Sequence, residues 1–101
     1  MTEEEALRIL DEYRAEIDVI DIEILKLLND RTRVVERIGQ VKREVGLPVY
    51  EPRREEEVYR NVTTHNHGPL SAGAVKRVFE RIIDEMRTIQ RERMRQANER
   101  S

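Results

Sequence analysis

The sequence contains no cysteine, and only 4% of its residues are aromatic. Without cysteine the chain cannot form disulfides, thiolate metal sites or a cysteine nucleophile, and a reducing compartment suits it. The few aromatic residues argue against a β-sandwich, whose strands are rich in them. No apolar run approaches the ~18 residues that a membrane-spanning helix requires. The acidic N-terminus does not resemble a secretory signal. We therefore expect a cytoplasmic, helical protein.

Charge is abundant and nearly balanced. Charged residues make up 40% of the chain, with 19 Lys and Arg against 21 Asp and Glu, for a net charge of −2. Proteins that bind nucleic acid usually carry a basic excess, so this balance disfavours that class. The 101 residues suffice for one domain, and we expect residues 1–101 to form it. Heavily solvated outer faces of a helical bundle explain the high charge.

A proline-free stretch, residues 3–45, dominates the chain. At ~1.5 Å per residue it predicts a helical rod of about 65 Å. A chain this small cannot cover such a rod, so we expect a partner to do so, most simply a second copy of the chain. The apolar residues recur at the spacing of one helix face; they are Leu7, Leu10, Ile17, Ile20, Ile24, Leu28, Val35, Ile38, Val41 and Val45.

Capping residues delimit this first helix and a second, shorter one. Thr2 is a good N-cap, and Gly46 followed by proline predicts the end of the first helix. Pro52 fits the first turn of a second helix, with Glu51 as its cap, running to about Thr63.

A third helix completes an all-α architecture of very long, short and long helices. Breakers in residues 64–69 predict a loop, and Ser71 caps a helix from about Ala72 to Arg95. Residues 96–101 are polar and are expected to fray.

Three long cations, Arg14, Arg31 and Lys42, lie on or beside the apolar face of the first helix. Arg31 and Lys42 are eleven positions apart, so their side chains leave the helix in nearly the same direction, about 16 Å apart along its axis. Two long side chains placed in this way can bind one small ligand between them. Arg14 is about 25 Å from Arg31 along the rod, so it can join such a site only from a partner chain. The competing interpretation is that the cations snorkel, or that Asp21 and Glu55 neutralise them structurally.

The sequence pattern does not decide the roles of several other residues. Gly39 allows either close helix packing or room for a ligand. Gln90 lies on the margin of the third helix's apolar face, as a surface residue or a donor into a pocket. Residues 51–57, including Arg54, read most simply as a solvated helix start. His65 and His67 flank Asn66 in a loop and lack the further ligands that a metal site needs.

Three segments together resemble the all-helical chorismate mutases, and the resemblance covers about residues 7–92. The first is Arg14-x-x-Ile17-x-x-Ile20-Asp21-x-x-Ile24-x-x-Leu27-Leu28-x-x-Arg31, followed by Ile38-Gly39-x-x-Lys42. The second is Pro48-Val49-Tyr50-Glu51-Pro52-Arg53-Arg54-Glu55, and the third is Val78-Phe79-x-x-Ile82-Ile83-x-x-Met86-Arg87-x-x-Gln90. The family implies a cofactor-free isomerase, without metal, that rearranges chorismate to prephenate in the shikimate pathway to the aromatic amino acids. It also implies an intertwined homodimer with two sites.

The resemblance also implies roles for individual residues. Arg14 from the partner chain and Arg31 would bind the two substrate carboxylates. Lys42 and Gln90 would donate to the ether oxygen of the breaking bond. Glu55 would accept from the ring hydroxyl, and Glu51 and Arg54 would shape the site around it.

Two positions depart from the family pattern, and two other functions compete. Position 51 is often Asp and is Glu here, while position 86 is often a small, substrate-facing Ser and is Met86 here. The alternatives are an isochorismate pyruvate lyase on the same scaffold and a non-catalytic helical dimerisation module. The family also occurs fused to other enzymes of aromatic biosynthesis, so a complex with such an enzyme is a further expectation.

Overall fold

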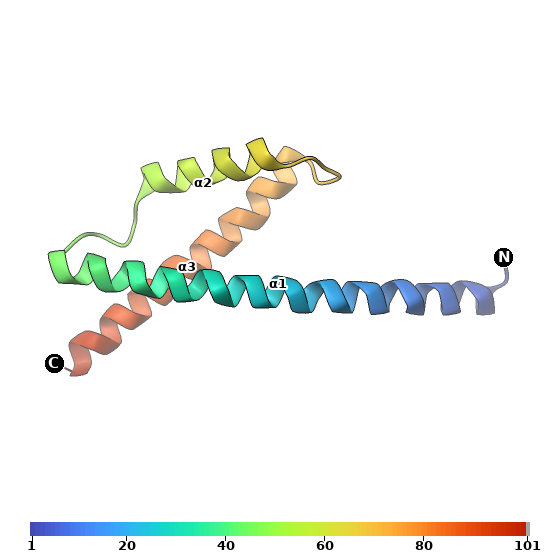
Figure 1. Ribbon diagram of the computed structural model, residues 1–101, viewed down its shortest axis with the longest axis horizontal. Helices are drawn as coiled ribbons and strands as arrows, with labels where there is room; N and C mark the ends of the chain where they lie inside the picture. The colour runs from blue at the N-terminus through green and yellow to red at the C-terminus, as the bar shows by residue number, and fades with distance from the viewer. Residues whose placement is uncertain (101) are drawn as a thin grey trace. The chain divides into compact units, whose positions relative to one another are not determined.

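The computed structural model describes residues 1–100, and these residues form three helices with no strand among them. The helices are α1 (Glu3–Val45), α2 (Pro52–His65) and α3 (Ala72–Arg100) (Figure 1). The predicted all-α class and the order of very long, short and long helices are confirmed. The chain divides into two compact units, Met1–Arg33 and a second that begins at Val34.

The predicted helix ends depend on local caps, and three of them are confirmed. The hydroxyl of Thr2 accepts a hydrogen bond of 3.1 Å from the backbone N–H of Glu5. The hydroxyl of Ser71 does the same for the N–H of Ala74, also at 3.1 Å. Gly46, just after α1, has φ of +72°, a left-handed conformation that other residues adopt at a cost.

The predicted starts of α2 at Pro52 and of α3 at Ala72 are confirmed, whereas the predicted C-terminal ends of both helices and the predicted Glu51 cap were wrong. Helix α2 continues past Thr63 to His65, whose Nδ1 is 2.8 Å from the carbonyl oxygen of Asn61 one turn back. Helix α3 continues past Arg95 to the last described residue, because no glycine or proline interrupts residues 96–100. Glu51 makes no capping hydrogen bond at the start of α2. Its carboxylate is instead committed to an ion pair described below.

The second unit contains the small buried core. Helices α2 and α3 pack on each other, and the loop between them is held by the side chain of Asn66. Asn66 donates to the carbonyl of Leu70 at 2.7 Å and accepts from the N–H of Gly68 at 3.0 Å. Three buried apolar side chains, Val75, Ile83 and Met86, lie at helical spacing on α3, and Val35 of α1 is buried as well.

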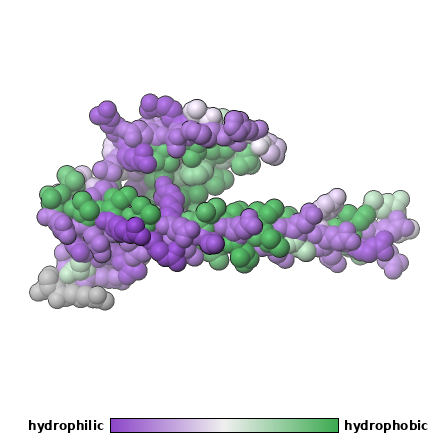
Figure 2. Space-filling view, in the orientation of Figure 1, coloured by the Kyte–Doolittle hydropathy of each residue, from purple (hydrophilic) through white to green (hydrophobic). Residues whose placement is uncertain are grey.

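The first unit consists of the N-terminal part of α1, and its apolar face is exposed. Ile17 is 55% exposed, and Ile20 and Ile24 are similarly open. Figure 2 shows apolar surface along this part of α1. None of the described helices is long and apolar enough to cross a membrane.

Candidate active site

A buried lysine is the centre of the candidate site. The side chain of Lys42, in the last turn of α1, is only 6% exposed. Its Nζ lies 3.1 Å from the carbonyl oxygen of Val49, 3.3 Å from Oε2 of Glu51 and 3.4 Å from Oε1 of Gln90. An ammonium group has three protons, so these acceptors satisfy a charge that would otherwise be costly to bury.

The local sequence explains how these acceptors reach Lys42. Gly46 ends α1, and Pro48 prevents the helix from continuing, so the chain turns back after one short segment. That turn carries Val49 and Glu51 to Lys42, which lies only seven and nine residues earlier in the chain. Gln90 comes from α3, 48 residues away along the chain.

Gln90 is buried, with 8% of its surface exposed, although it carries a polar amide. Because Oε1 accepts from Lys42, its amide nitrogen remains a donor for another group. A Cβ atom placed on Gly39 would lie 3.6 Å from Cγ of Gln90, an ordinary van der Waals contact. Of the two interpretations of Gly39, the structure therefore supports packing of α1 against Gln90.

A second polar cluster links α2 to α3. Glu55, at the start of α2, has a side chain that is 16% exposed, and its Oε2 lies 3.2 Å from Nε of Arg87. The guanidinium carbon of Arg87 also lies 5.3 Å from the centre of the Tyr50 ring. Tyr50 is the residue between Val49 and Glu51, so this cluster adjoins the partners of Lys42 in the chain.

The structure therefore brings Lys42, Glu51 and Gln90 into direct contact, while the three predicted arginines are placed differently. Arg54 is exposed and pairs with Glu57 of its own helix at 3.4 Å. Arg14 lies in the first unit, where its side chain is 65% exposed and pairs with Asp11 at 3.5 Å.

The third of these arginines, Arg31, also belongs to the first unit and is half-buried. Met86 lies in the core of the second unit as a buried apolar side chain of α3.

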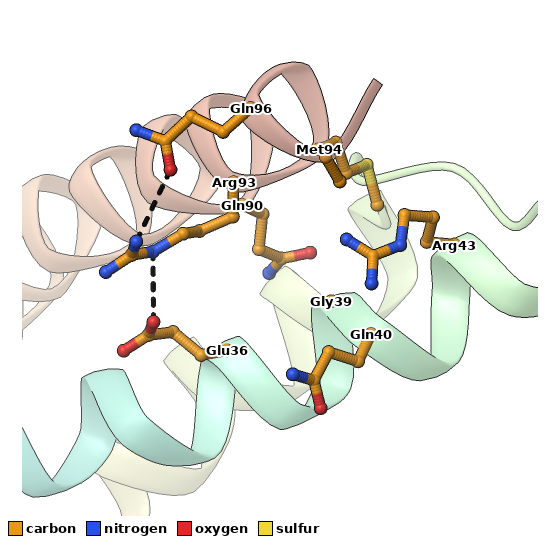
Figure 3. Close-up of a pocket in the computed structure, with 9 residues that line it drawn as sticks. Glu36, Gly39, Gln40, Arg43, Gln90, Arg93, Met94 and Gln96 are labelled. Atoms are coloured by element: carbon orange, nitrogen blue, oxygen red, sulfur yellow. Dashed lines mark hydrogen bonds and ion pairs between the residues drawn. The ribbon is translucent and has the colours of Figure 1, made fainter. Parts of the chain in front are cut away.

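Gln90 also borders a pocket of about 390 Å³ between the last turns of α1 and α3 (Figure 3). The pocket is lined by Glu36, Gly39, Gln40, Arg43, Gln90, Arg93, Met94, Gln96 and Ala97. Of its two arginines, Arg93 forms an ion pair with Glu36 at 3.0 Å and also donates to Gln96 at 3.3 Å. Gln90 is the one predicted site residue among the lining residues, and its amide extends from α3 toward α1 in Figure 3.

Sequence reasoning missed the Val49 carbonyl, Tyr50 and Arg87. A backbone carbonyl has no sequence signature, since every residue carries one. Arg87 is part of the third-helix pattern, between Met86 and Gln90, but the resemblance gave it no role, so its place in the pattern was the available signal. Among residues 1–100 no group of three or more His, Cys, Asp or Glu side chains is arranged to hold a metal ion.

Comparison with known proteins places the chain in a family. The family model described as chorismate mutase type II matches residues 13–91. The bifunctional chorismate mutase/prephenate dehydratase of Aquifex aeolicus is 38% identical over 78 residues, which are 73% of this chain and 22% of that protein. This chain thus spans about a fifth of the length of such curated relatives.

Two solved structures extend the match to the fold. A chorismate mutase from Thermus thermophilus is 35% identical with a TM-score of 0.78, covering 81% of this chain and 93% of that one. A chorismate mutase from Helicobacter pylori in complex with prephenate is 26% identical with a TM-score of 0.80, covering 87% of this chain and 96% of that one. The chain therefore belongs to the chorismate mutase type II family.

Proposed function

We propose that this chain is a chorismate mutase, an isomerase that rearranges chorismate to prephenate. The observation that carries the proposal is the buried ammonium of Lys42, which lies 3.4 Å from the buried amide of Gln90. Membership of the family and the similarity to a structure that holds prephenate support the same reaction.

The reaction type agrees with these residues. The rearrangement is unimolecular and pericyclic, so it requires no nucleophile, general base or cofactor. A protein accelerates it by holding the dianion in its compact reactive conformer and by placing donors where negative charge grows. A millionfold acceleration requires about 8 kcal/mol of transition-state stabilisation. A desolvated cation can supply much of this transition-state stabilisation, because charges interact more strongly out of water.

In this proposal Lys42 and Gln90 donate to the ether oxygen of the breaking bond. The ammonium acts as a point charge on a single oxygen, and the amide nitrogen of Gln90 supplies a second donor. Glu55 accepts from the ring hydroxyl with Oε1, since its Oε2 lies 3.2 Å from Nε of Arg87. Glu51 and Arg54 shape the site around that hydroxyl, Glu51 through its ion pair with Lys42.

The two substrate carboxylates are assigned to Arg31 and to Arg14 of a partner chain. Arginine suits this task because its planar group forms paired hydrogen bonds with a carboxylate. The partner is a second copy of the chain in an intertwined homodimer. The exposed apolar face of α1 supports this assembly, since Ile17, Ile20 and Ile24 would become buried in it.

Met86 supplies an apolar wall in place of the small polar residue common in the family. It removes one polar contact and narrows the pocket, but it does not alter the cationic groups. We also propose that residues 1–101 act as one domain in the cytoplasm. A complex with another enzyme of aromatic biosynthesis is consistent with relatives such as the Aquifex protein, whose name combines two activities.

A substrate assay tests the proposed reaction. The purified chain is incubated separately with chorismate and with isochorismate, and both prephenate and salicylate are measured. We expect prephenate from chorismate and no salicylate from isochorismate. Salicylate and pyruvate from isochorismate, without prephenate from chorismate, would instead identify a lyase on the same scaffold.

A thermal shift distinguishes either enzyme from a non-catalytic dimerisation module. A bicyclic dicarboxylate that mimics the transition state should raise the melting temperature of an enzyme, because a ligand that binds only the folded state stabilises it. An unchanged melting temperature together with no product from either substrate would favour the module.

A further inference from the structure

Arg87 occupies an unusual place among the ion pairs of the second unit. It lies in α3, its side chain is 25% exposed, and its partner Glu55 belongs to α2. By contrast, the pairs Arg54–Glu57 and Arg81–Glu85 join residues three or four apart on one helix and are largely exposed. Exposed pairs of that kind contribute little, whereas a half-buried pair between helices fixes both side chains.

The surroundings of Arg87 are acidic. The guanidinium contacts Asp84 of its own helix as well as Glu55. Burial raises the pKa of the nearby Tyr59 phenol, the negative charges of Glu55, Glu80 and Asp84 raise it further, and Arg87 lowers it. Arg87 is therefore the counter-charge for carboxylates that gather between α2 and α3.

The contact with Glu55 leaves that carboxylate usable. Nε of Arg87 lies 3.2 Å from Oε2 of Glu55, yet within residues 1–100 this buried nitrogen has no acceptor in hydrogen-bonding geometry. The pair is thus held by charge, and its contact involves Oε2 of Glu55, which is one of the two oxygens of that carboxylate. Because the positive charge of Arg87 compensates the carboxylate of Glu55, an anionic substrate meets less electrostatic repulsion when it approaches that carboxylate.

Arg87 also contacts the segment that supplies two partners of Lys42. Its guanidinium lies 5.3 Å from the centre of the Tyr50 ring, within the range of a cation–π contact. The neighbours of Tyr50 in the chain are Val49 and Glu51, both bound to Nζ of Lys42. One side chain of α3 therefore contacts both the start of α2 and the preceding segment.

We infer that Arg87 is a positioning residue that aligns Glu55 and, through Tyr50, the Val49–Glu51 segment around Lys42. The inference rests on the proposed function, because it assigns Glu55 to the ring hydroxyl and Lys42 to the ether oxygen. Arg87 acts through these groups and does not itself touch the substrate. Displacing a catalytic group by about 1 Å can cost as much as ~100-fold in rate, so loss of Arg87 should reduce turnover.

The test is a double-mutant cycle in the full chain with chorismate as substrate. The variants are Arg87→Gln, Glu55→Gln and the double variant, with prephenate formation measured as kcat and KM. We expect Arg87→Gln to lower kcat/KM by about 10- to 100-fold. We expect the double variant to resemble Glu55→Gln within about threefold, because effects that act through one group do not add. The inference would be overturned if the reductions in kcat/KM of the two single variants multiplied in the double variant, or if Arg87→Gln had a normal kcat/KM.

Three controls separate positioning from folding. Arg81→Gln removes the exposed ion pair with Glu85 of the same helix, outside the proposed site, and should leave kcat/KM unchanged. Arg87→Lys retains the charge but loses the flat guanidinium, so it should recover part of the activity. If Arg87→Gln melts early because Glu55 is left unpaired, the double variant removes that unpaired charge and decides the outcome. An inactive wild type would reject the proposed function and this inference together, whereas an active wild type with normal Arg87 variants would reject the inference alone.

Discussion

The ammonium of Lys42 and the side-chain amide oxygen of Gln90 are 3.4 Å apart, although 48 residues separate them in the chain. Both side chains are buried, and neither is placed by its own helix alone. Lys42 requires the turn after α1 for two acceptors, and Gln90 requires α3 to lie against Gly39. This pair is a preorganised arrangement of one cation and one amide, which is what stabilisation of a single developing oxygen charge requires.

Replacing Lys42 by Met should abolish most of the proposed activity and leave the fold intact. Met keeps an unbranched stem in the buried space, and Glu51, which is partly exposed, can be rehydrated when its partner is lost. Loss of one donor to a developing oxyanion typically costs about 100- to 1,000-fold in kcat. Prephenate formation and circular dichroism measure the two expectations. The matched control is Lys26→Met, an exposed lysine of the same helix. Normal turnover in Lys42→Met would remove Lys42 from the mechanism.

Replacing Gln90 by Glu should make activity depend on pH. A carboxyl group can donate to the ether oxygen only while it is protonated, and the ordinary pKa of Glu is about 4.3. Activity should therefore persist below the pKa of the new carboxyl group and fall about tenfold per pH unit above it. The control is Gln40→Glu, which places the same charge on the exposed side of the pocket. Its kcat-against-pH profile should match the wild type, and a flat profile for Gln90→Glu would refute the donor role.

The elements were predictable where local chemistry decides them. Thr2, Ser71 and Gly46 act within a few residues, so their roles can be read from the sequence. The end of α3 was predicted too early because polarity was interpreted as fraying, although residues 96–100 contain no helix breaker. Glu51 was predicted to cap α2, but a carboxylate near a buried ammonium gains more from the ion pair than from the cap.

The candidate site was predictable in its residue types and less so in its contacts. Lys42 and Gln90 were identified through the family resemblance, since spacing alone left snorkelling and surface interpretations open. The Arg87–Glu55 pair depends on how α2 packs against α3, which no periodicity within one helix encodes. In the proposed dimer the relation of Arg14 to the other cations depends on a second chain, and no single-chain pattern fixes it.

Replacing Gly39 by Ala should stabilise the protein. Glycine inside a helix is about 0.5–1 kcal/mol less favourable than alanine, and the new Cβ would meet only Cγ of Gln90, at 3.6 Å. We expect the free energy of unfolding to rise by about that amount in denaturant titrations, with activity within about twofold. Gly39→Val is the contrasting variant, because its additional carbons would press on Gln90. A destabilised Gly39→Ala would mean that α1 and α3 pack more closely than the structure indicates.

Mixing two inactive variants should restore activity if Arg14 acts across the dimer. In the proposed assembly each site combines Lys42 of one chain with Arg14 of the other, so Arg14→Ala and Lys42→Ala homodimers are both inactive. In a mixed dimer, one site contains both intact residues and the other contains neither. Random exchange makes about half of the dimers mixed, so about one quarter of all sites should be active.

The control for this mixing experiment combines two variants whose altered residues are supplied to a site by the same chain. Lys42→Ala mixed with Gln90→Ala places both defects in residues of the same unit, so no exchange of chains can assemble an intact site. Each chain must first be unfolded and refolded in the mixture, because an intertwined dimer exchanges subunits slowly. Recovery in the Arg14 mixture and none in the control would place Arg14 in trans. No recovery in either mixture would mean that Arg14 serves its own chain or no site at all, and the exposed apolar face of α1 would then need another explanation.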